Sequence, residues 1–272
     1  AHGVSCKVIA ADCRELAGAW HMTSEEAGRK LRYDAFYDEA RQIAEKLAAE
    51  HGGSPDDFSE HIRIAVAHNA DDQAETILFR VLRGTGTDGL AGIAYERKER
   101  GFSVVRPILD IPRKEIEEYC REHDLSPVED HTNHQSIYTR NKIRLELLPE
   151  LEKEYNENVR GALLRLGKIA ASDSDYLQQC AEEALQEFLR ETSSDEVVLE
   201  RDGLAGIHEA LRHRILLQSF ARLGLASDIS AERIAAADRI IEKKQAPKTV
   251  EFPRGYRVTV AGGLVHICAP KK

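Results

Sequence analysis

The sequence has no paired cysteines, no long apolar run and no excess of positive charge. Its five cysteines stand singly, without a histidine at zinc-ligand spacing, so neither a disulfide framework nor a zinc finger is predicted. No segment approaches the ~20 apolar residues of a membrane span, and the chain does not open with a signal peptide. We therefore expect a cytoplasmic protein with no membrane partner.

The formal net charge of -9 excludes a protein that coats nucleic acid indiscriminately, because such binding needs many cations that neutralise phosphates. Any RNA contact must be local. Basic residues cluster in one region against the acidic average, and the candidates for RNA contact there are Arg144, Arg160, Arg165 and Lys168. If only the charge of these residues is considered, we favour the interpretation that they form a solvated helix face.

What is present is typical of a folded chain: 42% hydrophobic residues beside 31% charged residues, and no low-complexity tract. A length of 272 residues predicts two domains. Residues 6–11 and 62–67 have the pattern of short strands, and each is followed by helical patterns, one opened by a capping box of Thr23 and Glu26. This alternation, with a further strand over 102–108, predicts an α/β fold with a parallel sheet.

In the second half of the chain, apolar residues recur every three or four positions, which predicts a helical region. Two further helices and then three short strands follow, expected at about 206–223, 231–244, 249–251, 257–260 and 264–268. We place the boundary near Tyr155. This gives an α/β domain over 1–155 and a mainly helical domain, ending in short strands, over 156–272.

The stretch after the second predicted strand is the most informative, because ligands of an open α/β sheet sit at the carboxyl ends of strands. Here His68 is followed by three carboxylates within one helical turn: Asp71, Asp72 and Glu75. Such a group could bind magnesium and position a base. Alternatively, Asp72 caps the helix and Glu75 reaches back, since acids in a first turn each gain about 0.3–1 kcal/mol. Helix stability leaves His68 and Asn69 unexplained.

Three glycines downstream, Gly84, Gly86 and Gly89, match the dinucleotide-binding pattern G-x-G-x-x-G. That pattern must follow a strand and open a helix, whereas this one follows a helix, so we reject a dinucleotide site. The glycines are more simply a helix C-cap and a flexible turn. The alternative that this loop lines an active-site cleft, where glycine lets the backbone approach a ligand closely, stays open.

A third stretch is acidic over 128–133 and then basic, with Arg140 and Arg144 one turn apart on a predicted helix. Two guanidinium groups so placed could bind phosphate. Surface salt bridges are the commoner use of such arginines. Spacing alone leaves both interpretations open.

Together these stretches resemble the tRNA(Ile)-lysidine synthetase family of N-type ATP pyrophosphatases. The motifs that carry the resemblance lie at residues 29–33, 68–76, 83–86, 89–92, 106–109, 129–133 and 140–149. The resemblance is strong from about Leu31 to Arg165 and weaker over the rest of the chain. It implies an ATP pyrophosphatase domain of the adenine nucleotide alpha hydrolase-like type, followed by a mainly helical substrate-binding domain.

The resemblance also implies a reaction. ATP would adenylate the C2 oxygen of the wobble cytidine in tRNA(Ile) with a CAU anticodon, and free L-lysine would displace AMP, with Mg²⁺ and ATP as cofactors. By this resemblance, Asp72 would bind magnesium, Glu75 would accept a proton from the lysine amine, Arg140 would bind the phosphate or adenylate, and His68 would orient the site. The remaining cofactor-binding candidates are Arg32, Gly84 and Gly86.

The sequence departs from the family pattern in two ways. Asn69 stands where many members have a second histidine. The family's serine- and glycine-rich loop, which grips the phosphates of ATP, would lie before Ala1, and an extra C-terminal domain would follow Lys272. We therefore expect an N-terminally truncated domain that is inactive alone.

Within the same superfamily, the nearest alternatives are a tRNA thiolase and an amidotransferase synthetase. The thiolase is disfavoured because enzymes of this type usually use paired cysteines. A non-catalytic RNA-binding or interaction module derived from an ATP pyrophosphatase stays open. A homodimer is also left open, because the sequence does not determine the oligomeric state.

Overall fold

The computed structural model describes residues 3–128, 139–243 and 248–270. The predicted motif residues 129–133 therefore lie outside the described residues. The chain divides into two compact units, Ala1–Leu82 with Gly92–Leu164 and Arg83–Ala91 with Arg165–Lys272. Among the helices of the described residues, none combines the length and the apolar character that a membrane crossing needs.

The division falls inside the long helix α9 (Val159–Phe188) and not near Tyr155. The reason is packing: Val159 and Leu163, at the start of α9, contact a buried cluster of the first unit. A boundary drawn where the helical pattern starts misses this contact.

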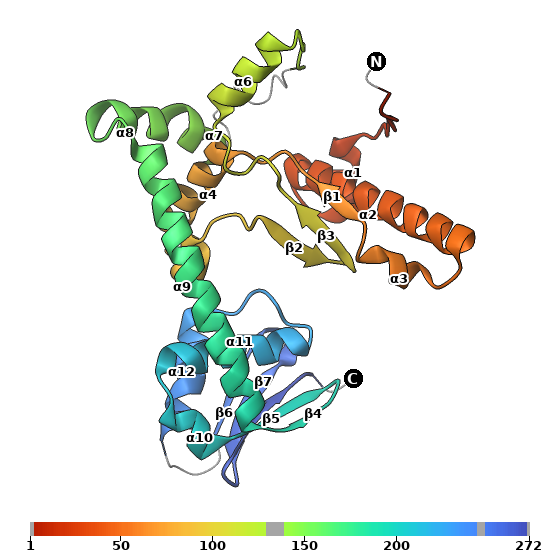
Figure 1. The fold of residues 1–272 in the computed structure, drawn as a ribbon. Helices are drawn as coiled ribbons and strands as arrows, with labels where there is room; N and C mark the ends of the chain where they lie inside the picture. Colours follow the sequence, from red (N-terminus) through yellow and green to blue (C-terminus); the bar gives the residue numbers. More distant parts are fainter. Residues whose placement is uncertain (1–2, 129–138, 244–247, 271–272) are drawn as a thin grey trace. The chain divides into compact units, whose positions relative to one another are not determined.

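The first unit combines helices with a small sheet (Figure 1). Its elements are α1 (Cys13–Trp20), α2 (Ser24–His51), α3 (Pro55–Ser59), β1 (Arg63–Ala65), α4 (Ala70–Leu82), β2 (Glu96–Glu99), β3 (Phe102–Val105), α6 (Arg113–Glu122), α7 (Thr139–Lys142), the π-helix η2 (Ile143–Leu147) and α8 (Leu148–Glu154). The capping box that was predicted to open α2 is confirmed, because Thr23 and Glu26 each bond the other's backbone N–H.

The sheet of the first unit runs in the order β1-β3-β2. Its β1 and β3 strands are parallel, as the strand and helix alternation predicted, but β2 pairs antiparallel with β3. Tyr33, Tyr37 and Ala40 of α2 pack against the apolar side chains of β1 and β3. The hairpin was not predicted because β2 reads Glu-Arg-Lys-Glu, without the apolar alternation that marks a half-buried strand.

The strand predicted over residues 6–11 is wrong. These residues form no ladder, and Val8 is 87% exposed. A run of apolar residues becomes a strand only where another strand supplies hydrogen-bond partners, and the described sheet consists of β1, β3 and β2.

The second unit is built on five antiparallel strands in the order β4-β5-β8-β7-β6. Its elements after α9 are β4 (Leu189–Thr192), β5 (Glu196–Glu200), α10 (Arg201–Gly206), α11 (Glu209–Arg222), α12 (Ala231–Glu242), β6 (Lys248–Glu251), the short helix η3 (Pro253–Gly255), β7 (Arg257–Ala261) and β8 (Leu264–Cys268). The helix α5 (Thr87–Leu90) belongs to this unit as well.

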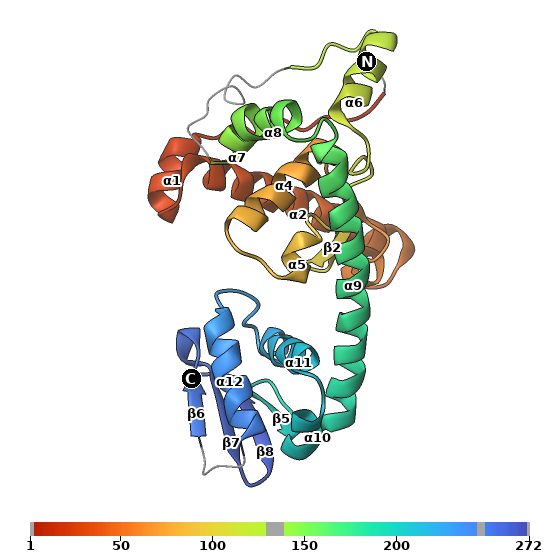
Figure 2. The ribbon, with the colours of Figure 1, turned by 90° about the vertical axis from the view of Figure 1, so that its left-hand side faces the viewer.

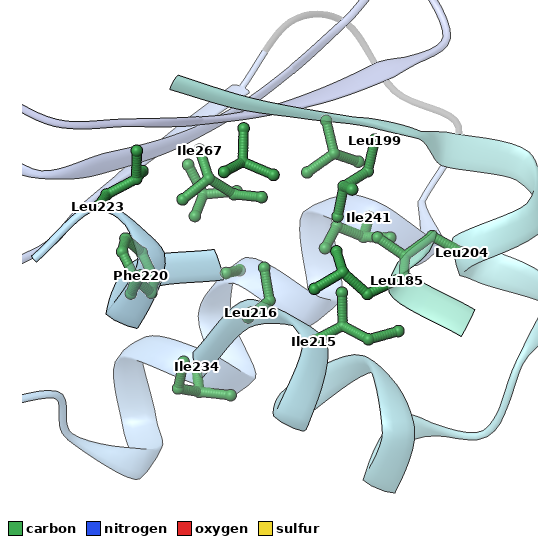
Figure 3. Packing of buried hydrophobic residues seen from close by; sticks show 14 of the residues in the cluster. Leu185, Leu199, Leu204, Ile215, Leu216, Phe220, Leu223, Ile234, Ile241 and Ile267 are labelled. Atoms are coloured by element: carbon green, nitrogen blue, oxygen red, sulfur yellow. The ribbon is translucent and has the colours of Figure 1, made fainter. Parts of the chain in front are cut away.

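The core of the second unit lies between the sheet and the helices α11 and α12 (Figure 2). Phe220 and Leu216 of α11 meet Ile241 of α12 and Ile267 of β8, and all four side chains are fully buried (Figure 3). The strands β6, β7 and β8 lie where the sequence predicted them. The pair β4 and β5 was missed, so this unit holds a larger sheet than the expected helical domain ending in short strands.

Candidate functional site

Helix α4 begins earlier than the capping interpretation assumed. It starts at Ala70, so Asn69 takes the capping position and Asp72 is the residue that reaches back. The Asn69 side chain accepts from the N–H of Asp72 at 3.1 Å, and the Asp72 carboxylate accepts from the N–H of Asn69 at 3.0 Å. The predicted alternative of an Asp72 and Glu75 capping box is therefore wrong, and helix capping does not explain Glu75.

Glu75 instead meets two arginines from α7 and η2. Arg140 Nε donates to it at 3.3 Å, and Arg144 donates through Nε at 2.5 Å and through Nη2 at 2.8 Å. Both arginines also donate to Asp72 Oδ1, at 3.2 and 3.1 Å. Asp72, Glu75 and Arg140, which sequence analysis placed in one site, thus come together from segments about 70 residues apart, and Arg144, which was predicted as an RNA contact, joins them.

Burial makes this cluster costly to break. Glu75 is only 1% exposed, whereas the side chains of Arg140 and Arg144 are 38% and 25% exposed. The bonds to Glu75 raise the pKa of Arg144 although burial opposes this. A charge as deeply buried as Glu75 needs its partners, because removing one partner of a buried pair costs about 3–5 kcal/mol.

The segment that carries Arg144 has an unusual backbone. Residues Ile143–Leu147 form a π-helix between α7 and α8, and Ile143 and Leu148 anchor it on Leu78 of α4. Single π turns are rare and frequently occur at functional sites. Here the turn lies directly beside the two carboxylates.

His68 leaves β1 toward the same cluster. Burial lowers its pKa, the positive charges of Arg106, Arg29 and Arg140 lower it further, and the charge of Asp72 opposes them. Its Nδ1 atom is buried and has no hydrogen-bond partner. The lowered pKa favours the neutral imidazole, and its unpartnered Nδ1 is therefore available to orient a polar ligand.

Two arginines at this site were missed as site residues. Arg106 is 3% exposed and donates to the Ala94 carbonyl at 2.6 Å, and Arg29 lies over the Tyr33 ring at 4.9 Å. Both stand in motifs that carried the family resemblance, which was the signal available in the sequence. Their closeness to His68 depends on how α2 and the end of β3 pack, which no spacing reveals.

Two other residues of the motifs have a structural task. The Gln73 amide donates to the Ile93 carbonyl at 3.1 Å and accepts from its N–H at 2.6 Å. Gly92 has a φ of +71°, and an added Cβ there would come within 2.5 Å of the Gln73 side chain. This clamp fixes the end of the glycine-rich segment on α4.

The described contacts of the cluster include none of the remaining predicted residues. Arg32 is exposed on α2, and Gly84 and Gly86 belong to the second unit. Arg160 pairs with Asp71 and Glu152, both at 2.8 Å. The other RNA candidates, Arg165 and Lys168, are exposed on the part of α9 in the second unit.

The carboxylates fit magnesium poorly in this arrangement. Two carboxylates and two guanidinium groups sum to zero charge, and both arginines donate to Asp72 Oδ1, so only Oδ2, which accepts one bond from the N–H of Asn69, keeps a lone pair. Mg²⁺ binds through carboxylates that keep free oxygen lone pairs. Asp72 as a metal ligand stays a prediction, and no step below depends on it.

An arginine-lined cluster at the end of a parallel strand is compatible with the binding of an anionic nucleotide. Comparison with known proteins shows the family to which this chain belongs. The model of the PP-loop domain family matches residues 2–151. The chain therefore belongs to the PP-loop domain family.

Similar curated proteins narrow this further to the tRNA(Ile)-lysidine synthases, and the chain is a member of that family. The protein of that name from Clostridioides difficile (strain 630) is 36% identical over 87% of this chain and 47% of its own length. The protein from Clostridium tetani is 34% identical over 94% of this chain and 50% of its own length. The protein from Thermosynechococcus vestitus is 30% identical over 94% of this chain and 72% of its own length. The chain spans about half the length of the first two.

Proposed function

We propose that this chain supplies the nucleotide and lysine site of an enzyme that makes lysidine in tRNA(Ile). In the proposed reaction, the C2 oxygen of the wobble cytidine attacks the α-phosphorus of ATP and pyrophosphate leaves. The amine of lysine then attacks C2, and AMP leaves with the oxygen. The observation that carries the proposal is the contact of Arg140 and Arg144 with the buried Glu75.

The arginines suit an anionic intermediate. Guanidinium groups bind phosphate through paired, charge-assisted hydrogen bonds, and the positive charges of Arg29, Arg106 and Arg140 all act on His68 and lower its pKa. We assign Arg140 to the phosphate of the adenylate, because it is the more exposed of the two arginines on Glu75. His68 would orient the base or the phosphate through its unpartnered Nδ1.

Glu75 is assigned to the lysine amine. If Arg140 turns to the phosphate, Glu75 loses one of its two cations and becomes a better proton acceptor. It would then take a proton from the lysine ammonium, so that the neutral amine can attack C2. Arg144 would stay paired and hold the carboxylate in place.

RNA contacts are proposed for Arg165 and Lys168, which are exposed three residues apart on α9 and so share one face. Arg144 and Arg160 are weaker candidates because carboxylates already engage them. Charge reversal of Arg165 to Glu should weaken tRNA binding and reduce its salt dependence. Unchanged binding would remove this face.

The activity is tested in the complete protein that contains this chain, by ATP- and tRNA-dependent incorporation of labelled lysine. Arg140→Ala should lower turnover about 100- to 1,000-fold, as the loss of one preorganised donor does. The matched control is Arg100→Ala, since Arg100 pairs with Asp34 at 2.7 Å on the surface of the same unit. Its activity should be unchanged.

A second readout separates the roles. Arg140→Ala should block formation of the adenylated tRNA, whereas Glu75→Gln should let the adenylate accumulate and stop the attack of lysine. Equal loss of both steps in both variants would contradict the assignment. A complete wild-type protein that binds tRNA without forming lysidine would favour a non-catalytic RNA-binding module.

A further inference from the structure

A group of potential metal ligands lies in the second unit and shares no residue with the cluster around Glu75. Glu209 and His213 are one turn apart on α11, and Asp238 lies on α12. One ligand atom from each residue lies within 4.8 Å of the other two. Among the described residues this is the one group of three metal-ligating side chains so close together.

The distance between two ligand atoms of the group suits a tetrahedral ion. His213 Nε2 lies 3.6 Å from an Asp238 oxygen, too far for a hydrogen bond. Zinc binds imidazole nitrogen and carboxylate oxygen at roughly 2.0–2.2 Å, so two ligands at a tetrahedral zinc lie about 3.4 Å apart.

The ligand atom of His213 also lacks any other partner. Its Nε2 is buried and makes no hydrogen bond, although the ring as a whole is 34% exposed. Buried polar atoms are normally satisfied, and an orphaned one asks for an explanation such as an ion. The atom faces Asp238, so a cation between them would satisfy both.

The surrounding charges favour a dication. Arg212 binds Asp238 through Nε at 2.6 Å and Nη2 at 3.1 Å, and Nη2 also binds Glu242 at 2.6 Å. Three carboxylates, including Glu209, and one guanidinium leave a net charge of -2. Because Arg212 takes one bond to each Asp238 oxygen, each oxygen keeps a lone pair for a metal.

Arg212 further orients the carboxylate. Its Nη1 also donates to the Ile207 carbonyl, and Asp238 is only 5% exposed. Partners of this kind fix the ligands of metal sites and are typical of them. The aspartate is therefore held in position before any ion arrives.

We propose that Glu209, His213 and Asp238 bind one divalent transition-metal ion, with zinc as the best match and solvent as the fourth ligand. The ion joins α11 to α12, the two helices that cover the sheet of the second unit. Because the bound ion would link the two helices, binding stabilises this unit. The proposal does not depend on lysidine synthesis.

The experiment uses the full chain after treatment with a chelator. Zn²⁺ should bind one ion per chain, and Co²⁺ should give the visible absorption of a tetrahedral site. At a free Zn²⁺ concentration 100 times the Kd, the melting temperature of the second unit should rise by roughly 5–10 °C. Magnesium at the same concentration should give no rise.

Two variants locate the site. His213→Gln and Glu209→Gln change partly or fully exposed side chains and should each weaken zinc binding at least about tenfold. The matched control is His266→Gln, since His266 hydrogen-bonds to Glu196 at 2.9 Å in the same unit and is no part of the group. Zinc binding absent from the wild-type chain, or equally strong in both ligand variants, overturns the proposal.

Discussion

Replacing Glu75 with glutamine is the sharpest test of the cluster, because it removes one charge and almost no volume. Glu75 is 1% exposed and accepts from two arginines, so the variant leaves Arg140 and Arg144 sharing Asp72. Loss of one partner from a buried pair costs about 3–5 kcal/mol. The arginines are partly exposed and can turn to water, so we expect about 3 kcal/mol.

The assay is urea unfolding of the 272-residue chain, followed by the fluorescence of its single tryptophan. Trp20 lies in α1 of the first unit, with the Lys30 amine 4.3 Å from its ring centroid, so its signal reports on that unit. With m of about 2 kcal/mol/M, a loss of about 3 kcal/mol lowers the unfolding midpoint by about 1.5 M. The surface control Asp34→Asn removes a partner of Arg100 and should cost less than about 1 kcal/mol.

A double-mutant cycle completes the test. If the pair with Arg144 carries most of the cost, then Arg144→Gln and Glu75→Gln together should destabilise less than the sum of the single variants, by about 1–3 kcal/mol. A single-variant loss as small as that of the surface control would refute the reasoning. The contacts would then be no more than exchangeable ion pairs.

Three further outcomes follow from the structure. Gly92→Ala should destabilise the first unit by about 1–3 kcal/mol in the same urea assay, because position 92 has a positive φ and the added Cβ would collide with Gln73. The control Gly18→Ala in helix α1 places its Cβ where no atom lies within 4 Å, so it should be neutral or slightly stabilising. The pKa of His68 should lie below 6.5 by NMR, so its contribution to stability is complete above that pH and is lost as the pH falls through the lower folded value; a midpoint above 6.5 would contradict this. Phe220→Ala should cost about 3–5 kcal/mol in calorimetry of the second unit, and a cost under 1 kcal/mol would mean that the core in Figure 3 is wrongly described.

The sequence predicted those elements whose burial repeats along the chain. The parallel pair β1 and β3, helix α2 with its capping box, and the three last strands all have regular patterns, and the structure contains them. Elements that depend on partners distant in the sequence were not predicted correctly. The charged strand β2 exists because it pairs with β3, and residues 6–11 lack the ladder that an apolar run alone cannot supply.

The candidate site shows why the exact start of a helix matters more than the identity of its acids. With Asp72 as the cap, Glu75 would reach back to the backbone, and helix stability would explain these two acids. With Asn69 as the cap, as observed, Asp72 fills that role and Glu75 lies one turn further, facing α7 and η2. A buried carboxylate in that position must be neutralised by cations from elsewhere in the chain. The need for Arg140 and Arg144 thus follows from where the helix begins, and a sequence pattern that is uncertain by one turn cannot reveal it.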